Sequence, residues 1–151
     1  MTTNKSYQEV LEYAIEREQE AQQTYLEAAK MVTDPAMREA LLEMAAQERG
    51  HEAKLRKLDV GKFLAASKQP VPSLDIAEYV VVGDFRPNLT YQELLMLAMN
   101  KEKAAYRLYT DLARVTPDED ARALFKALAQ EEARHKLAFE VEYDTQIFQE
   151  N

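Results

Sequence analysis

The sequence predicts an all-α fold, a four-helix bundle made of two antiparallel helical hairpins joined by a long crossover connection. The chain has 151 residues with only three Gly and five Pro, a composition that favours long helices over a turn-rich β architecture. Apolar residues recur at steps of three and four along four long stretches, as on the buried face of a helix. The second half also repeats the first at an offset of 84 positions, the separation of Glu48 from Glu132, which indicates a duplicated hairpin.

The first and third helices are expected to begin at the same start signal. Ser6 stands three residues before Glu9, as Thr90 stands three residues before Glu93. In such a capping box the hydroxyl and the carboxylate accept hydrogen bonds from backbone N–H groups at the start of the helix. Both helices therefore have a defined first turn.

The second and fourth helices are expected to begin at a proline, which is tolerated at the first helical position. Asp34 precedes Pro35, and Thr116 precedes Pro117 with Glu119 following. With these boundaries the four helices are expected at residues 7–32, 35–59, 91–115 and 117–148.

We expect a single domain over residues 1–151, because a chain of this length supports one stable core. It divides into a hairpin over 6–59, a crossover over 60–89 and a hairpin over 90–148. The crossover is too long for a tight turn, but it suits a segment that passes along the full length of a bundle. A short helix is expected within it at residues 73–79.

Residues 80–82 are three valines, which are expected to be extended. Together with Phe85 they form an apolar patch in the crossover. The sequence leaves open whether this patch forms a homodimer interface or packs onto its own bundle.

Composition excludes several classes of function. The chain has no Cys, so it has no disulfides, thiolate zinc sites or iron–sulfur centres. The formal net charge of −8 argues against nucleic acid as a partner, because phosphate binding needs a basic surface. The N-terminus has no apolar signal segment and no stretch is long enough to span a membrane, so we expect a cytoplasmic protein with no membrane partner.

Six acidic and imidazole side chains occur at equivalent positions of the two repeats. Each histidine comes three residues after a glutamate, and another glutamate lies on the preceding helix of each hairpin. At the rise of an α-helix all six fall near mid-bundle on core-facing stripes. One Glu from each of two helices with Glu-x-x-His from each of the other two is an established di-metal ligand set. The candidate ligands are Glu18, Glu48, His51, Glu102, Glu132 and His135.

Burial of this cluster without a metal is unfavourable, since each unpaired ion in an apolar seam costs several kcal/mol. Two divalent cations offset the four carboxylate charges. Carboxylates with neutral imidazoles suit iron or manganese, whereas zinc usually takes fewer carboxylates. The alternative of a bundle with no metal requires protonated or hydrated carboxylates.

Three further residues lie near the predicted ligands in the sequence. Glu131 competes with Glu132 as a ligand because it also shares a helix face with His135, but the repeat favours Glu132. Tyr25 and Tyr109 lie two helical turns after the ligands of their helices, where their hydroxyls either hold carboxylate ligands in orientation or pack as ordinary core aromatics.

These motifs carry a resemblance to a known family. They are Glu18-Gln-Glu-Ala21-x-x-x-Tyr25, Glu48-Arg-Gly-His51, Glu102-Lys-Lys-Ala105-x-x-x-Tyr109 and Glu132-Ala-Arg-His135. With them the sequence resembles the rubrerythrin branch of the ferritin-like superfamily over residues 6–148. The resemblance implies a ferritin-like bundle that holds two iron ions. It also implies an oxidoreductase, which either reduces hydrogen peroxide or, as in relatives within the superfamily, oxidises ferrous iron or activates dioxygen.

Within this resemblance each residue has an expected role. Glu48 and Glu132 are expected to bridge the two irons, Glu18 and Glu102 to bind one iron each, and the two histidines to complete one iron each. The six ligands would act in catalysis through the metals.

The sequence departs from the family pattern in two respects. Rubrerythrins carry a rubredoxin-like module with four cysteines that delivers electrons, and this chain has none, so we expect an external electron donor. Rubrerythrins also tend to have a further Glu where this chain has Ala105. The peroxidase-linked exchange of ligands is therefore not implied.

Two other functions remain open at this level. A dimanganese site that disproportionates peroxide, as in manganese catalases, would use the same ligand types. A non-catalytic protein, in which the ions only neutralise buried carboxylates and stabilise the bundle, would bind metal without responding to peroxide.

Overall fold

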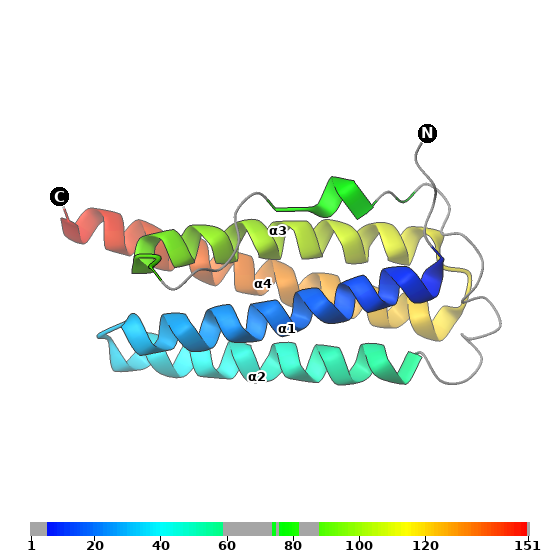
Figure 1. The fold of residues 1–151 in the computed structure, drawn as a ribbon, viewed down its shortest axis with the longest axis horizontal. Helices are drawn as coiled ribbons and strands as arrows, with labels where there is room; N and C mark the ends of the chain where they lie inside the picture. Colours follow the sequence, from blue (N-terminus) through cyan, green and yellow to red (C-terminus); the bar gives the residue numbers. More distant parts are fainter. Residues whose placement is uncertain (1–5, 59–73, 75, 82–87, 151) are drawn as a thin grey trace.

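The computed structural model describes residues 6–58, 74, 76–81 and 88–150. The chain forms a bundle of long helices (Figure 1), and no strand occurs among the described residues. The elements are α1 (Tyr7–Met31), α2 (Pro35–Leu58), the short 3₁₀ helix η2 (Ile76–Tyr79), α3 (Tyr91–Val115) and α4 (Glu119–Glu150). The predicted all-α bundle of two antiparallel hairpins is confirmed.

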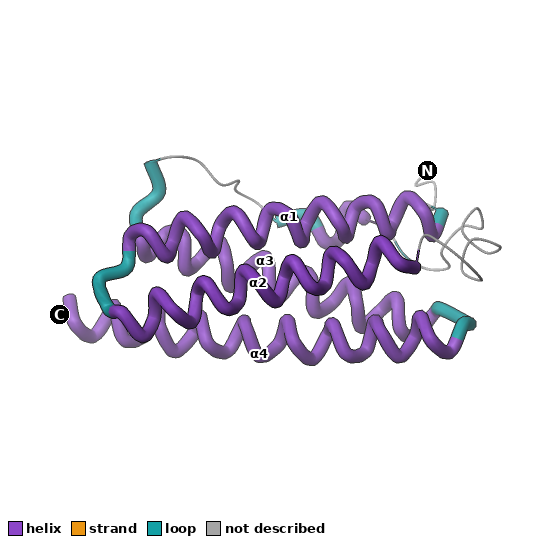
Figure 2. The backbone as a smooth tube through the Cα atoms, turned by 90° about the horizontal axis from the view of Figure 1, so that it is seen from below, coloured by secondary structure: helices purple, strands orange, loops and turns teal. Residues whose placement is uncertain are grey.

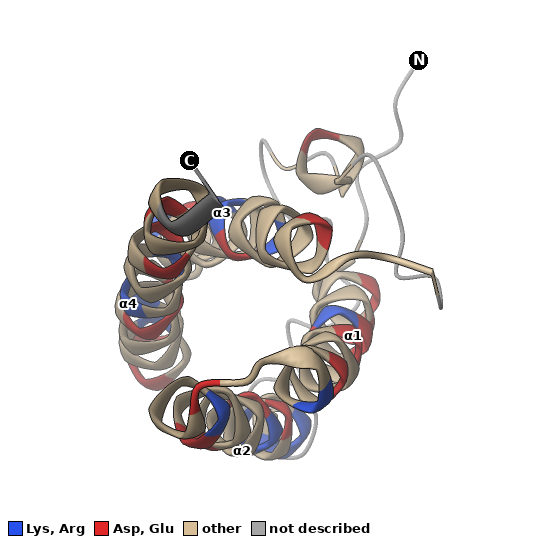
Figure 3. Ribbon diagram, turned by 90° about the vertical axis from the view of Figure 1, so that its left-hand side faces the viewer, with Lys and Arg blue, Asp and Glu red and all other residues tan. Residues whose placement is uncertain are grey.

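The four long helices surround one central axis. Viewed end-on, α1 lies between α2 and α3, and α4 closes the ring beside α2 and α3 (Figure 3). The α1–α2 turn and the α3–α4 turn lie at opposite ends of the bundle (Figure 2). Tyr7 at the start of α1 donates a hydrogen bond to the carbonyl of Val115 at the end of α3, at 3.1 Å, so these two helices also run antiparallel.

The connection between the hairpins begins and ends at opposite ends of the bundle, because α2 ends at one and α3 begins at the other (Figure 1). Within the short helix predicted at 73–79, the structure describes η2, which lies along α3. Val80 and Val81 follow it without regular structure. Val82 and Phe85 lie outside the described residues, so the predicted apolar patch stays a prediction.

Both predicted capping boxes are present. The backbone N–H of Glu9 donates to the Ser6 hydroxyl at 3.2 Å, and that of Glu93 donates to the Thr90 hydroxyl at 3.1 Å. In each box the glutamate also accepts from the backbone N–H of the capping residue. The two hairpins therefore start with the same local structure.

The predicted start of the fourth helix was wrong by two residues. Thr116 does not cap α4, because its backbone N–H bonds back to Leu112 and ends α3. Asp118 takes over the start of α4, where its side chain accepts from the N–H of Ala121 at 2.9 Å. Pro117 consequently lies in the turn, and α4 begins at Glu119.

An arginine closes the turn of each hairpin, at equivalent positions of the repeat. Arg38 donates to the carbonyls of Ala29 and Val32, and Arg122 donates to those of Thr116 and Pro117. These bonds pair carbonyls that the ends of α1 and α3 would otherwise leave without partners.

The apolar core consists of two clusters. One packs around Phe125 with residues from the start of α1 and the end of α3, and the other packs around Phe139 with residues from the end of α1 and the start of α3. A layer of buried polar side chains separates them at mid-bundle. Among the described residues, no helix has both the length and the apolar content that a membrane span requires.

Candidate metal centre

The buried polar layer is made of the six predicted ligands. Each of the four long helices contributes, and no member is more than 5% exposed. The helical periodicity that buries neighbouring leucines also turns these residues inward, because they occupy the same stripes. They are Glu18 on α1, Glu48 and His51 on α2, Glu102 on α3, and Glu132 and His135 on α4.

Their ligand atoms form two overlapping groups. Within each group, one oxygen or nitrogen per residue lies within 4.8 Å of the others. Glu48 and Glu132 belong to both groups, so they lie between the two halves of the site. The first group adds Glu18 and His51, and the second adds Glu102 and His135.

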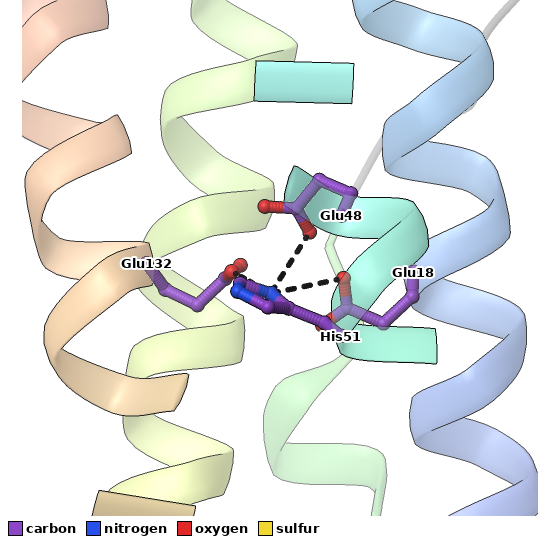
Figure 4. A group of neighbouring side chains, drawn as sticks. All are labelled: Glu18, Glu48, His51 and Glu132. Atoms are coloured by element: carbon purple, nitrogen blue, oxygen red, sulfur yellow. Dashed lines mark ion pairs between the residues drawn. The ribbon is translucent and has the colours of Figure 1, made fainter. Parts of the chain in front are cut away.

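Both histidines turn Nδ1 toward the carboxylates. The Nδ1 of His51 lies 2.9 Å from Glu132, 3.5 Å from Glu18 and 3.8 Å from Glu48 (Figure 4). The Nδ1 of His135 lies 2.7 Å from Glu48 and 3.6 Å from Glu102. Each imidazole therefore meets a glutamate from its own group and at least one that the two groups share.

The outer ring nitrogens have partners that the sequence reasoning missed. The Nε2 of His51 pairs with the carboxylate of Glu131, and the Nε2 of His135 lies 2.6 Å from the Oε1 of Gln47. Both partners are acceptors, so each ring can donate from Nε2, and Nδ1 can bind a metal once it carries no proton. Gln47 and Glu131 are equivalent in the repeat, so the signal was one position before each Glu-x-x-His.

The structure also shows that Glu131 and Glu132 differ in exposure and in their contacts. The Glu131 side chain is 38% exposed and contacts the outer edge of His51, whereas that of Glu132 is 2% exposed and lies inside the cluster. Of these two residues, only Glu132 belongs to the groups of ligand atoms, and it belongs to both.

The buried ligand atoms are chemically suited to bind a pair of metal ions. Eight of them lack a hydrogen bond of acceptable geometry among the described residues, although several lie close together. Buried polar atoms without partners are costly, and carboxylate oxygens with imidazole nitrogens are ligands that iron and manganese accept. The eight are Oε2 of Glu18, both oxygens of Glu48 and of Glu102, Oε1 of Glu132, and Nδ1 of His51 and of His135.

Two of the carboxyl groups favour the protonated form in the metal-free protein. Burial raises the pKa of Glu48 well above its ordinary value, and the charges of Glu132 and Glu18 raise it further. Burial and the charge of Glu132 also raise the pKa of Glu102. Protons therefore replace part of the positive charge that metal ions would supply.

The pKa values of the other three groups shift in different directions. Burial lowers the pKa of His51, but the nearby carboxylates of Glu132 and Glu18 outweigh burial and raise it to about 10. Burial raises the pKa of Glu132, yet the nearby imidazole of His51 and the neighbouring glutamates bring it below the ordinary value. Burial lowers the pKa of His135. Because metal binding must displace the proton of His51, metal uptake should improve as the pH rises.

The free energy of unfolding of the metal-free protein is expected to fall as the pH rises from 6.5 to about 10. Over this range folded His51 keeps a proton that the unfolded chain releases, so the folded state loses relative stability. The raised pKa values of Glu48 and Glu102 act in the same sense from pH 4.5 upward. The lowered pKa values of Glu132 and His135 act only below 4.5 and 6.5, and there they oppose this trend. Urea denaturation with a chelator at several pH values measures the trend, and stability that rises with pH would contradict it.

The two tyrosines of the repeat differ in their contacts. Tyr109 on α3 donates a buried hydrogen bond to Glu18 on the neighbouring helix α1, at 2.6 Å. The hydroxyl of Tyr25 has no hydrogen-bond partner among the described residues, and its ring lies edge-on to His135 and against Phe139. The geometry gives Tyr109 the contact expected of a residue that orients a carboxylate, and it gives Tyr25 only packing.

Replacing Tyr109 with Phe is expected to destabilise the metal-free protein by about 1.5–3 kcal/mol, because a buried carboxylate loses a charge-assisted hydrogen bond. Tyr25→Phe is the matched control, and it should change stability little because no hydrogen bond is lost. Urea denaturation of both variants measures the difference. Equal losses in the two variants would show that the bond to Glu18 is not what matters.

The sequence matches the model of a known protein family. Residues 9–143 match the model described as rubrerythrin. No curated protein matches the sequence significantly.

Three solved structures are similar to this one. A hypothetical protein from Pyrococcus furiosus is 26% identical, with a TM-score of 0.68, over 92% of this chain and 89% of its own. A Thermotoga maritima protein classed as a ferritin-like diiron-carboxylate protein is 24% identical, with a TM-score of 0.83, over 95% and 98% of the two chains. A manganese catalase from Anabaena PCC7120 is 17% identical, with a TM-score of 0.61, over 96% and 75%. The last two likenesses concern the fold.

Proposed function

Since the chain belongs to the rubrerythrin family, we propose that it is a di-iron carboxylate protein that carries out redox chemistry on peroxide or dioxygen. The observation that carries the proposal is the pair of overlapping ligand groups that share Glu48 and Glu132. Carboxylates common to two groups are suited to bridge two ions. Glu18 and His51 would complete one ion, and Glu102 and His135 the other.

The residues of the chain prepare the site before an oxidant arrives. Tyr109 holds Glu18 in place, and the outer partners of the histidines keep Nδ1 directed at the carboxylates. The low exposure of the whole layer strengthens every charge interaction within it. When bound, two ferrous ions supply one electron each, so that peroxide and two protons yield two water molecules. An external donor must then restore the electrons, because the chain has no cysteine centre of its own.

A dimanganese catalase is the second candidate. Manganese accepts the same carboxylates and imidazoles as iron, and the fold resembles that of a manganese catalase. Such a site would convert two peroxide molecules into dioxygen and water and would need no external donor.

Metal analysis after anaerobic loading with iron or with manganese tests the proposal. We expect about two irons per chain, by analogy with the di-iron bundles. Adding peroxide to the iron-loaded protein should produce ferric absorption, and a reductant should reverse it. Manganese loading with evolution of dioxygen would favour the catalase. Metal that stabilises the protein without reacting would indicate a structural role, and the absence of metal uptake would overturn the proposal.

A further inference from the structure

A cavity of about 80 Å³ lies between α1 and α3 and reaches the carboxylate cluster. Its lining includes all four glutamates of the site but neither histidine. Both oxygens of Glu48 and of Glu102 are buried and lack hydrogen bonds, so the cavity ends at unpartnered polar atoms. The histidines and their outer partners contact the cluster from α2 and α4.

Small residues at equivalent positions of the repeat make room for this cavity. Ala21 on α1 and Ala105 on α3 both line it. Alanine at both positions leaves space beside the ligands that a larger side chain would fill. The volume of about 80 Å³ admits roughly five to eight water-sized molecules, since one water needs roughly 10–15 Å³ on this measure.

The rim of the cavity carries a cluster of charges. Arg17 and Lys101 are also equivalent in the repeat, and both line the cavity. Glu20 joins them, at 3.4 Å from Arg17 and 2.7 Å from Lys101. Tyr79 and Val80, at the end of η2, line the same cavity. The rim is thus charged, and the end of η2 forms part of the cavity wall.

We propose that this cavity is the route and binding pocket through which an oxidant of two oxygen atoms, peroxide or dioxygen, reaches the carboxylate side of the metal pair. This inference rests on the proposed function.

The test fills the cavity with Ala105→Leu. Ala40→Leu is the matched control, because Ala40 is a partly buried alanine on α2 that packs against the core away from the cavity. Two rates are measured. One is the association of azide with ferric-loaded protein, followed by the absorption of azide bound to ferric iron. The other is the oxidation of ferrous-loaded protein by hydrogen peroxide. We expect Ala105→Leu to slow both by about tenfold or more at unchanged metal content, because a filled cavity in a close-packed interior leaves no passage. Ala40→Leu should change neither.

A variant at the rim keeps the inference testable if Ala105→Leu fails to fold. Glu20→Gln removes an exposed negative charge and leaves Arg17 and Lys101 at the opening. Azide, an anion, should then associate about threefold faster at low salt, and the gain should shrink as salt screens the charges.

The outcomes separate the route from the function. Unchanged azide and peroxide rates in Ala105→Leu, or unchanged azide association in Glu20→Gln, would overturn the route. Wild-type protein that binds iron and azide but does not react with hydrogen peroxide would overturn the proposed function alone. Failure to bind metal would overturn both.

Discussion

Glu132→Gln is expected to abolish stable metal loading and to lower the rate of peroxide-driven oxidation by at least about a hundredfold, more than the loss typical of an outer partner of a ligand. The substitution preserves shape but removes a charge from the residue that belongs to both ligand groups. Both metal positions should therefore weaken together. Metal analysis and stopped-flow absorbance measure the two effects.

Glu131→Gln is the control for this change, because it alters the adjacent residue in the same way. Glu131 contacts only the outer edge of His51, so its loss should lower metal affinity by about tenfold, as for an outer partner of a ligand. Full metal loading of Glu132→Gln would refute the bridging role. Equal defects in the two variants would show that Glu131 is as important as Glu132.

Removing the metal from the loaded protein is expected to lower its stability by about 4 kcal/mol for each of the two ions, or about 8 kcal/mol in all, when free metal had exceeded both dissociation constants a thousandfold. For a domain of this size that loss corresponds to a fall in Tm of roughly 20 °C. The physical reason is the set of eight buried donor atoms, which metal ions would pair and which protons pair only in part.

Calorimetry of the loaded and the chelator-treated protein measures the shift. Glu132→Gln serves as a control, since its Tm should depend much less on added metal. A wild-type Tm that is the same with and without metal would mean that the buried carboxylates are already satisfied in another way.

The fold was largely predictable because its signals are local and occur twice. The capping boxes at Ser6 and Thr90 and the apolar stripes both follow from short-range rules, and the structure confirms them. The start of α4 was not predictable in the same way. Thr116 and Asp118 are both capping residues, and the choice between them depended on which one the end of α3 had already used.

The candidate site shows the same division between backbone and side-chain effects. Periodicity and the repeat were enough to predict that the six candidate ligands lie in one layer, since both determine where the backbone places a residue. The contacts of Tyr25 and Tyr109 could not be read in that way. Their positions are equivalent, but one hydroxyl meets Glu18 and the other meets no acceptor, because side-chain orientation depends on the packing around each ring.

The outer partners of the two histidines show what a duplication within one chain permits. Two identical hairpins that paired as separate molecules would have to place the same residue behind both imidazoles. Here the two hairpins belong to one polypeptide, and a neutral amide stands behind His135 while a carboxylate stands behind His51. The two halves of one chain can therefore carry different residues at equivalent positions, and these outer partners would give the two proposed metal positions imidazoles of different basicity.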